Sequence, residues 1–325
     1  MRRGLSASAL GVGIGVFAAI VAAGTGVAST LGGQPRPRRL VLIAGAPSHG
    51  PGEHEYRAGC LLFQKALAGV PGLTVQVFTD GWPTKLAGTE RVDDRAPLDQ
   101  ADAIFIFADG GSGHPILQHD RMKVLDDLAA RGVGLGFAHY AVEVPAGPAG
   151  AAMQRWIGGY YETNYSVNPV WAPEFTRLPV HPITRGVAPF STSDEWYFNM
   201  RWTDDPALKS HLTPTLVATP SDAVRAGPYV SPPGPYPHIV AASGRPETMM
   251  WALERPDGGR SFGFTGGHRH ARWGDPNERR LVLNALVWIA KLEVPPGGVS
   301  DRITAADLAA NLDPKAAPGS AAPGR

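Results

Sequence analysis

The stretch RLVLIAG at residues 39–45 decides the fold class that we predict for this chain of 325 residues. It is a short apolar run that ends in Gly45 and is followed closely by Pro47, as expected for a parallel strand buried on both faces. Residues 55–67 then have apolar side chains at helical spacing, and the alternating run LTVQVF at 73–78 predicts a second strand. From residue 39 the chain is therefore predicted to form a strand, a helix and a second strand, the unit from which parallel sheets are built.

The same alternation continues downstream. The predicted elements are a strand at 103–107 (AIFIF), an amphipathic helix at 121–130, a strand at 133–138 (VGLGFA), two strands at 174–180 and 215–218, a strand pair at 248–254 and 260–265, and a closing helix at 277–291. This order predicts an α/β fold in which a mostly parallel sheet carries helices on both faces.

Both ends of the chain differ in composition from this core. Residues 1–29 begin with Met-Arg-Arg, continue without charge and end in small residues, which is typical of an export signal. A retained membrane anchor is the alternative, and residues 30–38 are interpreted as a linker. We therefore expect an exported protein, periplasmic or at the cell surface, which contacts a membrane only if residues 1–29 stay uncleaved. A tail is expected over 293–325, rich in Pro, Ala and Gly and disordered from about residue 313.

The charge of the chain argues against one class of partner. Of its 30 Lys and Arg residues, Arg2 and Arg3 fall in the export signal, which leaves 28 against 29 Asp and Glu. No excess of positive charge is left to bind a phosphate backbone, so we expect no nucleic-acid partner. Cys60 is the only cysteine and lies in the predicted helix 55–67, where we interpret it as a buried structural thiol.

Titratable side chains follow several of the predicted strands. They are His49, Glu53 and His54 after the first strand, His139, Tyr140 and Glu143 after the fourth, and His268 and His270 after the last. Ligands bind beyond the carboxyl ends of the strands in an open parallel sheet, so this gathering predicts a polar pocket there. His268 and His270 alternate, and only one of them can point into the pocket if the strand continues. Of the first group we expect one member to reach it.

Three short segments carry a family resemblance in their order and spacing. HPITRG at 181–186, DEWY at 194–197 and GGHRH at 266–270 resemble the ThuA-like (trehalose utilisation) family, and with the strand pattern the resemblance covers residues 39–292. It implies a fold similar to that of class I glutamine amidotransferases, a flavodoxin-like sheet. Those enzymes carry a nucleophilic cysteine in a tight turn after a strand. The matching residues 134–140 (GLGFAHY) contain no cysteine, so we expect no amidotransferase chemistry by a thiolate.

The resemblance also implies carbohydrate metabolism, because relatives accompany dehydrogenases that form 3-keto-glycosides, including 3-keto-trehalose. A keto group at C3 acidifies the C2 hydrogen, so that a base can remove it and form an enolate. Epimerisation, or elimination or hydrolysis of the glycosidic substituent, would follow. Such a site needs a base with a pKa near neutral, an oriented partner and a group that stabilises the oxyanion. We assign these roles by hypothesis to His268 as base, Glu195 as its partner or the acid, and His139 with His49 around the oxyanion.

The expected partner is a small carbohydrate. A carboxylate next to aromatic side chains, as in Glu195-Trp196-Tyr197, is a frequent feature of sugar sites. The residues expected to contact the substrate are His49, Glu53, Tyr140, Glu143, Trp196, Tyr197 and His270.

Two other functions stay open. A non-catalytic carbohydrate-binding protein on a degenerate amidotransferase fold fits the missing nucleophile. A metal-dependent hydrolase fits the converging His and Glu side chains, which could hold Zn²⁺ or another divalent ion. The sequence fixes neither the metal nor its ligands, because it contains no HExxH spacing. DGGSG at 109–113 lacks both common phosphate-binding fingerprints, so we predict no nucleotide site.

Overall fold

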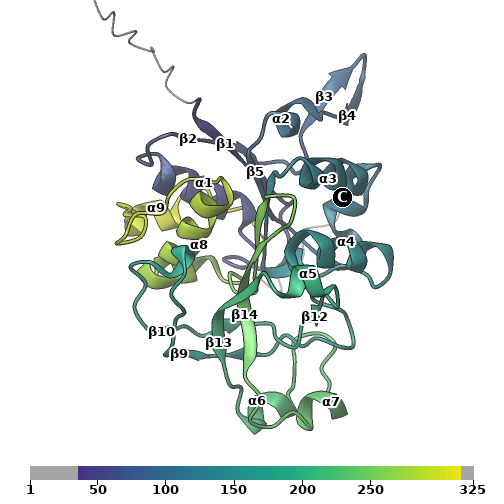
Figure 1. The fold of residues 1–325 in the computed structure, drawn as a ribbon, viewed down its shortest axis with the longest axis vertical. Coiled ribbons are helices and arrows are strands. Elements are labelled where there is room, and N and C mark those ends of the chain that lie inside the picture. The colour runs from purple at the N-terminus through teal and green to yellow at the C-terminus, as the bar shows by residue number, and fades with distance from the viewer. Residues whose placement is uncertain (1–35, 316–325) are drawn as a thin grey trace, which may run out of the picture. The chain divides into compact units, whose positions relative to one another are not determined.

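The computed structural model describes residues 36–315, and a central sheet of seven strands organises them (Figure 1). The strands are β1 (Arg38–Ala44), β2 (Leu73–Phe78), β5 (Ala103–Phe107), β6 (Gly134–Ala138), β13 (Leu212–Ala218), β14 (Glu247–Glu254) and β15 (Arg260–Phe264). Their order across the sheet is β13-β14-β15-β6-β5-β1-β2. Neighbours from β15 to β2 are parallel, whereas β14 is antiparallel to both β13 and β15. The predicted mostly parallel α/β sheet is thus confirmed.

Helices cover both faces of this sheet (Figure 1). α1 (Tyr56–Leu67) and α8 (Pro276–Ile289) pack on one face, and α3 (Arg121–Ala130) and α4 (Pro148–Ile157) pack on the other. Alternate side chains of β5 enter the two hydrophobic cores, because successive side chains of a strand point to opposite faces. The sheet is therefore buried on both sides, which explains its continuously apolar strands.

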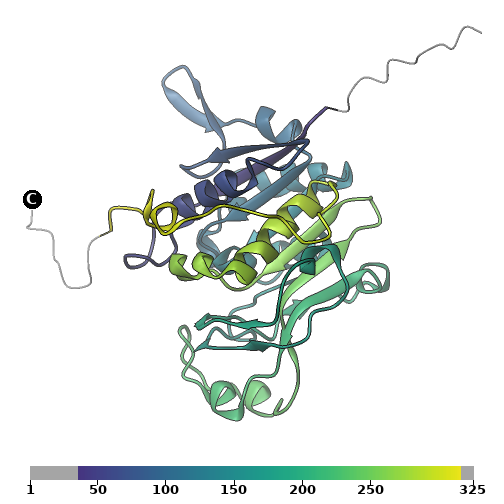
Figure 2. The ribbon, with the colours of Figure 1, turned by 90° about the vertical axis from the view of Figure 1, so that its left-hand side faces the viewer.

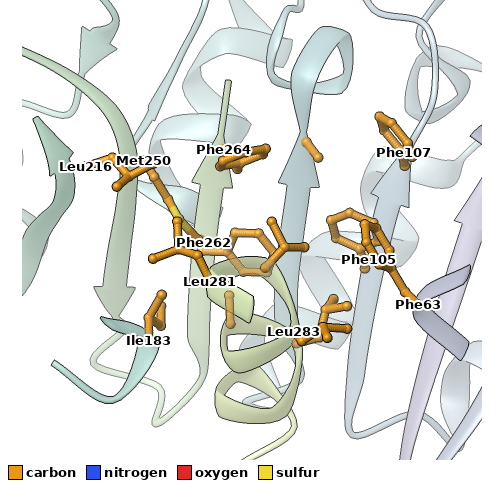
Figure 3. Close-up of a cluster of buried hydrophobic side chains, with 14 of the residues drawn as sticks. Phe63, Phe105, Phe107, Ile183, Leu216, Met250, Phe262, Phe264, Leu281 and Leu283 are labelled. Carbon is orange, nitrogen blue, oxygen red and sulfur yellow. The ribbon is translucent and has the colours of Figure 1, made fainter. Parts of the chain in front are cut away.

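Side chains of α1 and α8 pack against side chains of the sheet in one hydrophobic core (Figure 3). Phe105 and Phe262 stack with their ring centroids 5.8 Å apart. Leu281 of α8 and Phe63 of α1 pack in the same core (Figure 3). Each fully buried side chain of this size contributes about 1.5–3 kcal/mol through the hydrophobic effect. This packing fixes the sheet, and with it the points at which its loops emerge.

Residues 159–202 form three short antiparallel pairs. These are β7 (Gly159–Tyr160) with β12 (Arg201–Trp202), β8 (Val170–Trp171) with β11 (Asp194–Glu195), and β9 (Glu174–Phe175) with β10 (Phe190–Ser191). The strand predicted at 174–180 is therefore too long. Its partner β10 has only two residues, and Pro179 has no N–H to extend the ladder.

The other elements of the described residues are short. They are the hairpin of β3 (Thr84–Ala87) and β4 (Glu90–Asp93), and the helices α2 (Ala96–Asp99), α5 (Pro206–Lys209), α6 (Asp222–Ala226), α7 (Pro237–Val240) and α9 (Ala305–Ala309). None of the helices within residues 36–315 combines the length and apolar character needed to cross a bilayer. The export signal predicted at 1–29 lies outside the described residues.

The chain after α8 returns to α9, which packs beside α1 (Figure 2). Beyond α9, the backbone N–H of the buried Asp313 donates a hydrogen bond to Glu55 at 2.7 Å, and the Lys315 ammonium lies 3.2 Å from the same carboxylate. Residues 313–315, which fall in the tail expected to be disordered from about residue 313, make these contacts with a buried carboxylate. Residues 316–325 lie outside the described residues.

Candidate functional site

A polar pocket with a volume of about 410 Å³ lies beyond the carboxyl ends of the parallel strands. The loop after β1 brings His49 and His54 to it, and the turn after β6 brings Tyr140 and Glu143. The loop after β5 contributes Gly111 to the lining. The opposite wall comes from the segment of short strand pairs and from residues 230–232. The sheet topology thus brings together loops that are far apart in the sequence.

His139 occupies the turn directly after β6. Its backbone φ is 52°, in the left-handed region, and its side chain is completely buried. Burial holds the pKa of His139 well below its usual range, and the neighbouring His54 and His268 lower it further. Its Nδ1 lies 3.1 Å from the Thr265 carbonyl oxygen, so we assign the ring proton of the neutral imidazole to Nδ1. An imidazole nitrogen, Nε2, therefore faces His54 and His268 from the turn for which the amidotransferase resemblance implies a cysteine.

His54 reaches the same place from the loop after β1, where its φ is 46°. Its Nδ1 lies 3.2 Å from Asp109 Oδ1, and that oxygen also accepts hydrogen bonds from Tyr56 (2.6 Å) and Ser48 (2.7 Å). Burial lowers the pKa of His54 to about 4. Burial acts to raise the pKa of Asp109, but the hydrogen bonds from His54, Tyr56 and Ser48 outweigh it and hold that pKa at about 2. An ionised Asp109 thus orients a neutral His54.

His268 comes from the loop after β15. The Asp194 carboxylate fixes this loop by accepting the backbone N–H groups of Gly267 (2.9 Å), His268 (3.1 Å) and Arg269 (3.2 Å). The His268 Nδ1 lies 3.0 Å from Glu195 Oε2. Burial alone would lower the pKa of His268, but the hydrogen bond and the charge of Glu195 raise it above the ordinary value.

The three imidazoles converge on one point. His54 Nε2 lies 3.0 Å from His139 Nε2 and 3.0 Å from His268 Nδ1, and the last two atoms are 3.2 Å apart. The contacts of Asp109 and Thr265 place the ring protons of His54 and His139 on the outer nitrogens, so lone pairs face inward. Such lone pairs repel one another unless a cation or a proton lies between them.

This arrangement fits a divalent metal ion. Nitrogen ligands lie about 2.0–2.1 Å from a tetrahedral Zn²⁺ ion, which puts them about 3.3 Å from one another. The separations of 3.0–3.2 Å are close to that value. Metal-binding histidines usually donate their other ring N–H to a carboxylate or carbonyl, and Asp109 provides such a partner for His54 Nδ1. The three imidazoles could therefore hold the ion, with the Glu195 carboxylate next to His268 Nδ1.

Two further carboxyl groups line the pocket: Glu195, which also contacts His268, and Glu143. Asn168 donates from Nδ2 to Glu195 Oε1 at 2.8 Å and accepts the backbone N–H of Ser231 at 3.1 Å. Glu143 accepts a hydrogen bond from Thr163 at 2.7 Å. Burial and the nearby Glu195 charge raise the pKa of Glu143 to about 7, although the Thr163 bond opposes them. At neutral pH Glu143 can therefore both accept and release a proton.

Most of the site residues predicted from sequence lie together. His49, Tyr140, Glu143, Glu195 and Tyr197 line the pocket, while His139 and His268 lie behind its surface next to His54. The Tyr197 hydroxyl is 3.2 Å from His139 Nε2. Glu53 lies at the edge, with Oε1 3.5 Å from His268 Nε2.

Two predicted residues do not reach the pocket. Trp196 is completely buried in the α8-side core, where its ring packs on Phe264 and its Nε1 donates to the Thr192 carbonyl at 3.0 Å. Its neighbours in the sequence, Glu195 and Tyr197, point to the pocket, because alternate side chains of an extended chain point in opposite directions. His270 is buried on the side of Glu55, away from the three imidazoles.

Sequence reasoning missed three contributors. They are Asp109, which the sequence presents only as part of DGGSG, and Tyr56 and Asn168. Asp109 lies just after β5, at the carboxyl end of a predicted strand, and that position could have identified it. Asn168 follows no strand of the central sheet, and no signal in the sequence marks it.

Comparisons with known proteins agree with this architecture. Residues 57–289 match the family model ThuA, described as trehalose utilisation. A solved structure of a protein described as ThuA-like from Bacteroides uniformis ATCC 8492 superposes with a TM-score of 0.52 at 15% identity, covering 79% of this chain and 93% of that one. The structure of PurLQS from Thermotoga maritima gives a TM-score of 0.40 at 12% identity, covering 78% and 99%. No curated protein sequence matches this chain.

The family match spans most of the described residues, and the fold agrees with it. The central sheet and its helices fit the class I glutamine amidotransferase-like fold. The family description relates the protein to carbohydrate utilisation. This chain belongs to the ThuA (trehalose utilisation) family.

Proposed function

We propose that this protein is a metal-dependent enzyme that processes 3-keto-glycosides by removing the C2 proton. The observation that carries the proposal is the convergence of three buried imidazole nitrogens, 3.0–3.2 Å apart, beside a polar pocket. His54, His139 and His268 would hold a divalent ion such as Zn²⁺. A bound divalent ion supplies Lewis-acid polarisation of the substrate carbonyl.

The pocket suits a sugar of limited size. Its volume of about 410 Å³ is at the lower end of the range for small-molecule sites. Carboxylate, amide and hydroxyl groups of Glu195, Asn168 and Thr163 are suited to the hydroxyls of a sugar ring. The signal-like residues 1–29 support an exported location for this activity.

Glu143 is the base that we propose for the C2 proton. Its pKa of about 7 matches proton transfer near neutral pH, and the Thr163 hydroxyl orients its carboxylate. This differs from the hypothesis drawn from sequence, in which His268 is the base. His268 Nε2 lies 3.5 Å from Glu53 Oε1, and its Nδ1 lies 3.0 Å from Glu195 Oε2, so neither ring nitrogen is left free to accept a substrate proton. Because Nδ1 is also within 3.2 Å of the other two imidazole nitrogens, its position favours sharing an ion with them.

The reaction balances without a further reactant. Glu143 takes the C2 proton, and the electrons of the C–H bond form a C2–C3 double bond as the C3 oxygen gains negative charge. Return of a proton to the opposite face of C2 gives the epimer. Alternatively, the C3 carbonyl re-forms, the enolate electrons make a C1–C2 double bond, and the bond from C1 to the glycosidic oxygen breaks. The oxygen that leaves takes up a proton, which balances the one removed from C2.

An NMR time course in D₂O tests the proposal with 3-keto-glycosides, metal-stripped protein and protein supplied with Zn²⁺, Mn²⁺ or Co²⁺. We expect deuterium at C2 or release of the aglycone only in the metal-supplied samples. Glu143→Gln should bind the metal but lose turnover. Exposed Glu90, in β4, provides the control Glu90→Gln, which should keep both. Sugar binding without exchange under every metal condition would instead indicate a non-catalytic carbohydrate-binding protein.

A further inference from the structure

The segment 312–315 packs on the loop that carries His54. After α9 the chain passes along α1, where Arg57 donates from Nη2 to the Leu312 carbonyl at 3.2 Å and from Nε to Asp313 Oδ1 at 3.0 Å. These contacts join residues that are more than two hundred positions apart. The end of the described chain therefore reaches the loop after β1, which supplies an imidazole to the site.

Glu55 is the centre of this contact. It is 1% exposed, and its two oxygens bind both the loop and the C-terminal segment. Oε1 accepts the backbone N–H of Gly52 at 3.0 Å and lies 3.2 Å from the Lys315 ammonium, and Oε2 accepts the backbone N–H of Asp313 at 2.7 Å. A buried carboxylate is costly unless it is paired, so Lys315 is a required partner and not a surface ion pair.

Lys315 also binds the backbone of the loop directly. Its side chain is 7% exposed, and its Nζ donates to the Glu53 carbonyl and, at 3.3 Å, to the His54 carbonyl. An ammonium group has three donors, and here Glu53, His54 and Glu55 accept all three. The ammonium thus fixes the peptide groups on both sides of His54.

The backbone of His54 needs such support. Its φ of 46° lies in the left-handed region, which is unfavourable for a residue other than glycine. The N–H of His54 donates to the His268 carbonyl at 2.9 Å, and the carbonyls of Glu53 and His54 are held by Lys315. Contacts from two distant segments therefore over-determine a strained conformation, and that conformation points the imidazole at His139 and His268.

We infer that Lys315 is a positioning residue for the site. It holds the loop 52–55 in the conformation that brings His54 Nε2 to within 3.0 Å of the other two imidazoles. The role is indirect, because Lys315 binds backbone and Glu55 and contacts no side chain of the imidazole cluster. The consequence for metal binding rests on the proposed function, whereas the consequence for the position of His54 does not.

The test compares Lys315→Met with Lys65→Met in the full chain. Lys65 forms an exposed ion pair between α1 and Asp307 of α9, so its variant loosens the same C-terminal segment without touching the loop. The first readout is the ¹⁵N and ring-proton NMR spectrum of the imidazoles in metal-free protein, with His54 assigned by its loss in His54→Gln. We expect the His54 signals to shift in Lys315→Met and to stay unchanged in Lys65→Met.

The second readout is Co²⁺ affinity, followed by the visible absorption of the bound ion. Removal of a group that orients a metal ligand typically lowers affinity 10–100-fold, and we expect a loss of that size in Lys315→Met only. If Lys315→Met does not fold, Glu55→Gln/Lys315→Met removes the buried charge together with its partner and should show the same loss. Unchanged His54 signals in a folded Lys315 variant would overturn the inference. A wild-type protein that binds no Co²⁺ would overturn the proposed function alone.

Discussion

The amino and carboxyl ends of the parallel strands differ in the partners that surround their titratable groups. At the amino ends of β1 and β5, Asp102 forms ion pairs with Arg36 and Arg38 at 2.8 and 2.7 Å, and both arginines are substantially exposed. At the carboxyl ends, buried imidazoles face one another, and the nearby Glu195 charge adds to burial in raising the pKa of Glu143. Asp102 at the amino ends lies beside groups of opposite charge, whereas Glu143 at the carboxyl ends lies near the like-charged Glu195, and the imidazole nitrogens there face one another. Buried titratable groups without a partner of opposite charge are typical of functional sites.

The largest expected effect comes from removing an imidazole at the carboxyl ends. His139→Asn keeps a residue that tolerates the left-handed backbone but removes one of the three nitrogens. Metal affinity should fall by more than the roughly 10–100-fold that loss of an orienting partner costs, and turnover should vanish. Isothermal titration and the D₂O exchange assay measure both.

His114→Asn is the matched control for that variant. His114 is also completely buried, but it caps a short helix and contacts the Ala141 carbonyl at 3.0 Å, outside the imidazole cluster. The control should keep full metal affinity. Equal losses of metal affinity in the two variants would show that both histidines serve only folding. The carboxyl ends of the strands would then contain no metal site to set against the amino ends.

Glu143→Gln should give the next largest effect. Loss of a general base typically costs about 10²–10⁴-fold in rate. In the wild type, kcat/KM should rise with pH and level off above about 7, where Glu143 is ionised. The variant should lack this rise, and a wild-type profile that is flat between pH 5 and 8 would exclude Glu143 as the base.

The same variant tests the stability of the folded protein. Because the pKa of Glu143 is raised from 4.5 to about 7 on folding, the folded state keeps its proton while the unfolded state loses it. Wild-type stability should therefore fall as the pH rises from 4.5 to 7, by up to about 3 kcal/mol from this group. Denaturant unfolding at pH 5 and pH 8 should show a smaller difference in Glu143→Gln.

Asp109→Asn should have an intermediate effect. The variant keeps the size of the side chain but removes the negative charge that orients His54. We expect a loss of about 10–100-fold in metal affinity with little change in the affinity for sugar. An unchanged Co²⁺ titration would mean that Tyr56 and Ser48 suffice to hold the imidazole.

Asp102→Asn, at the amino ends, should have the smallest effect. Burial acts to raise the pKa of Asp102, but its arginine partners and the backbone N–H of Arg39 lower it overall. The wild-type carboxylate therefore contributes stability that is present above pH 3.8 and is lost as the pH falls through the folded-state pKa. We expect a loss of about 1 kcal/mol at pH 7, which disappears in acid, with metal binding and turnover unchanged.

Much of the fold could be predicted because the sheet is buried on both faces. Continuously apolar strands such as β1 and β5 are visible in the sequence, and the helices between them have a clear period. The pairs within residues 159–202 were less accessible, because two-residue strands have no period to detect. Their position depends on Asp194 and Glu195, whose partners lie in other loops.

The sequence indicates where the candidate site lies, but it does not assign a role to each of its residues. The position of His139 and His268 after strands predicts the edge of the sheet at which the structure brings these two side chains together. His49 and His54 both line the pocket, but only His54 brings a ring nitrogen to His139 and His268. This difference depends on the positive φ of both residues, and no local sequence pattern specifies how such a loop turns. The pKa of Glu143 depends on burial by distant segments, so its suitability as a base is a property of the folded chain alone.

Gly110 limits how this pocket could change. A Cβ at this position would lie 2.0 Å from the Tyr140 carbonyl oxygen, so the loop after β5 and the turn after β6 touch backbone to backbone. Neither can shift without displacing the other, and a larger side chain at 110 would disturb Asp109 and His139 together. A homologue that accepts a bulkier substrate would therefore have to gain its space elsewhere. Residues 230–232 line the pocket from outside the sheet, so a change of side-chain size there would alter the pocket without passing through this backbone contact.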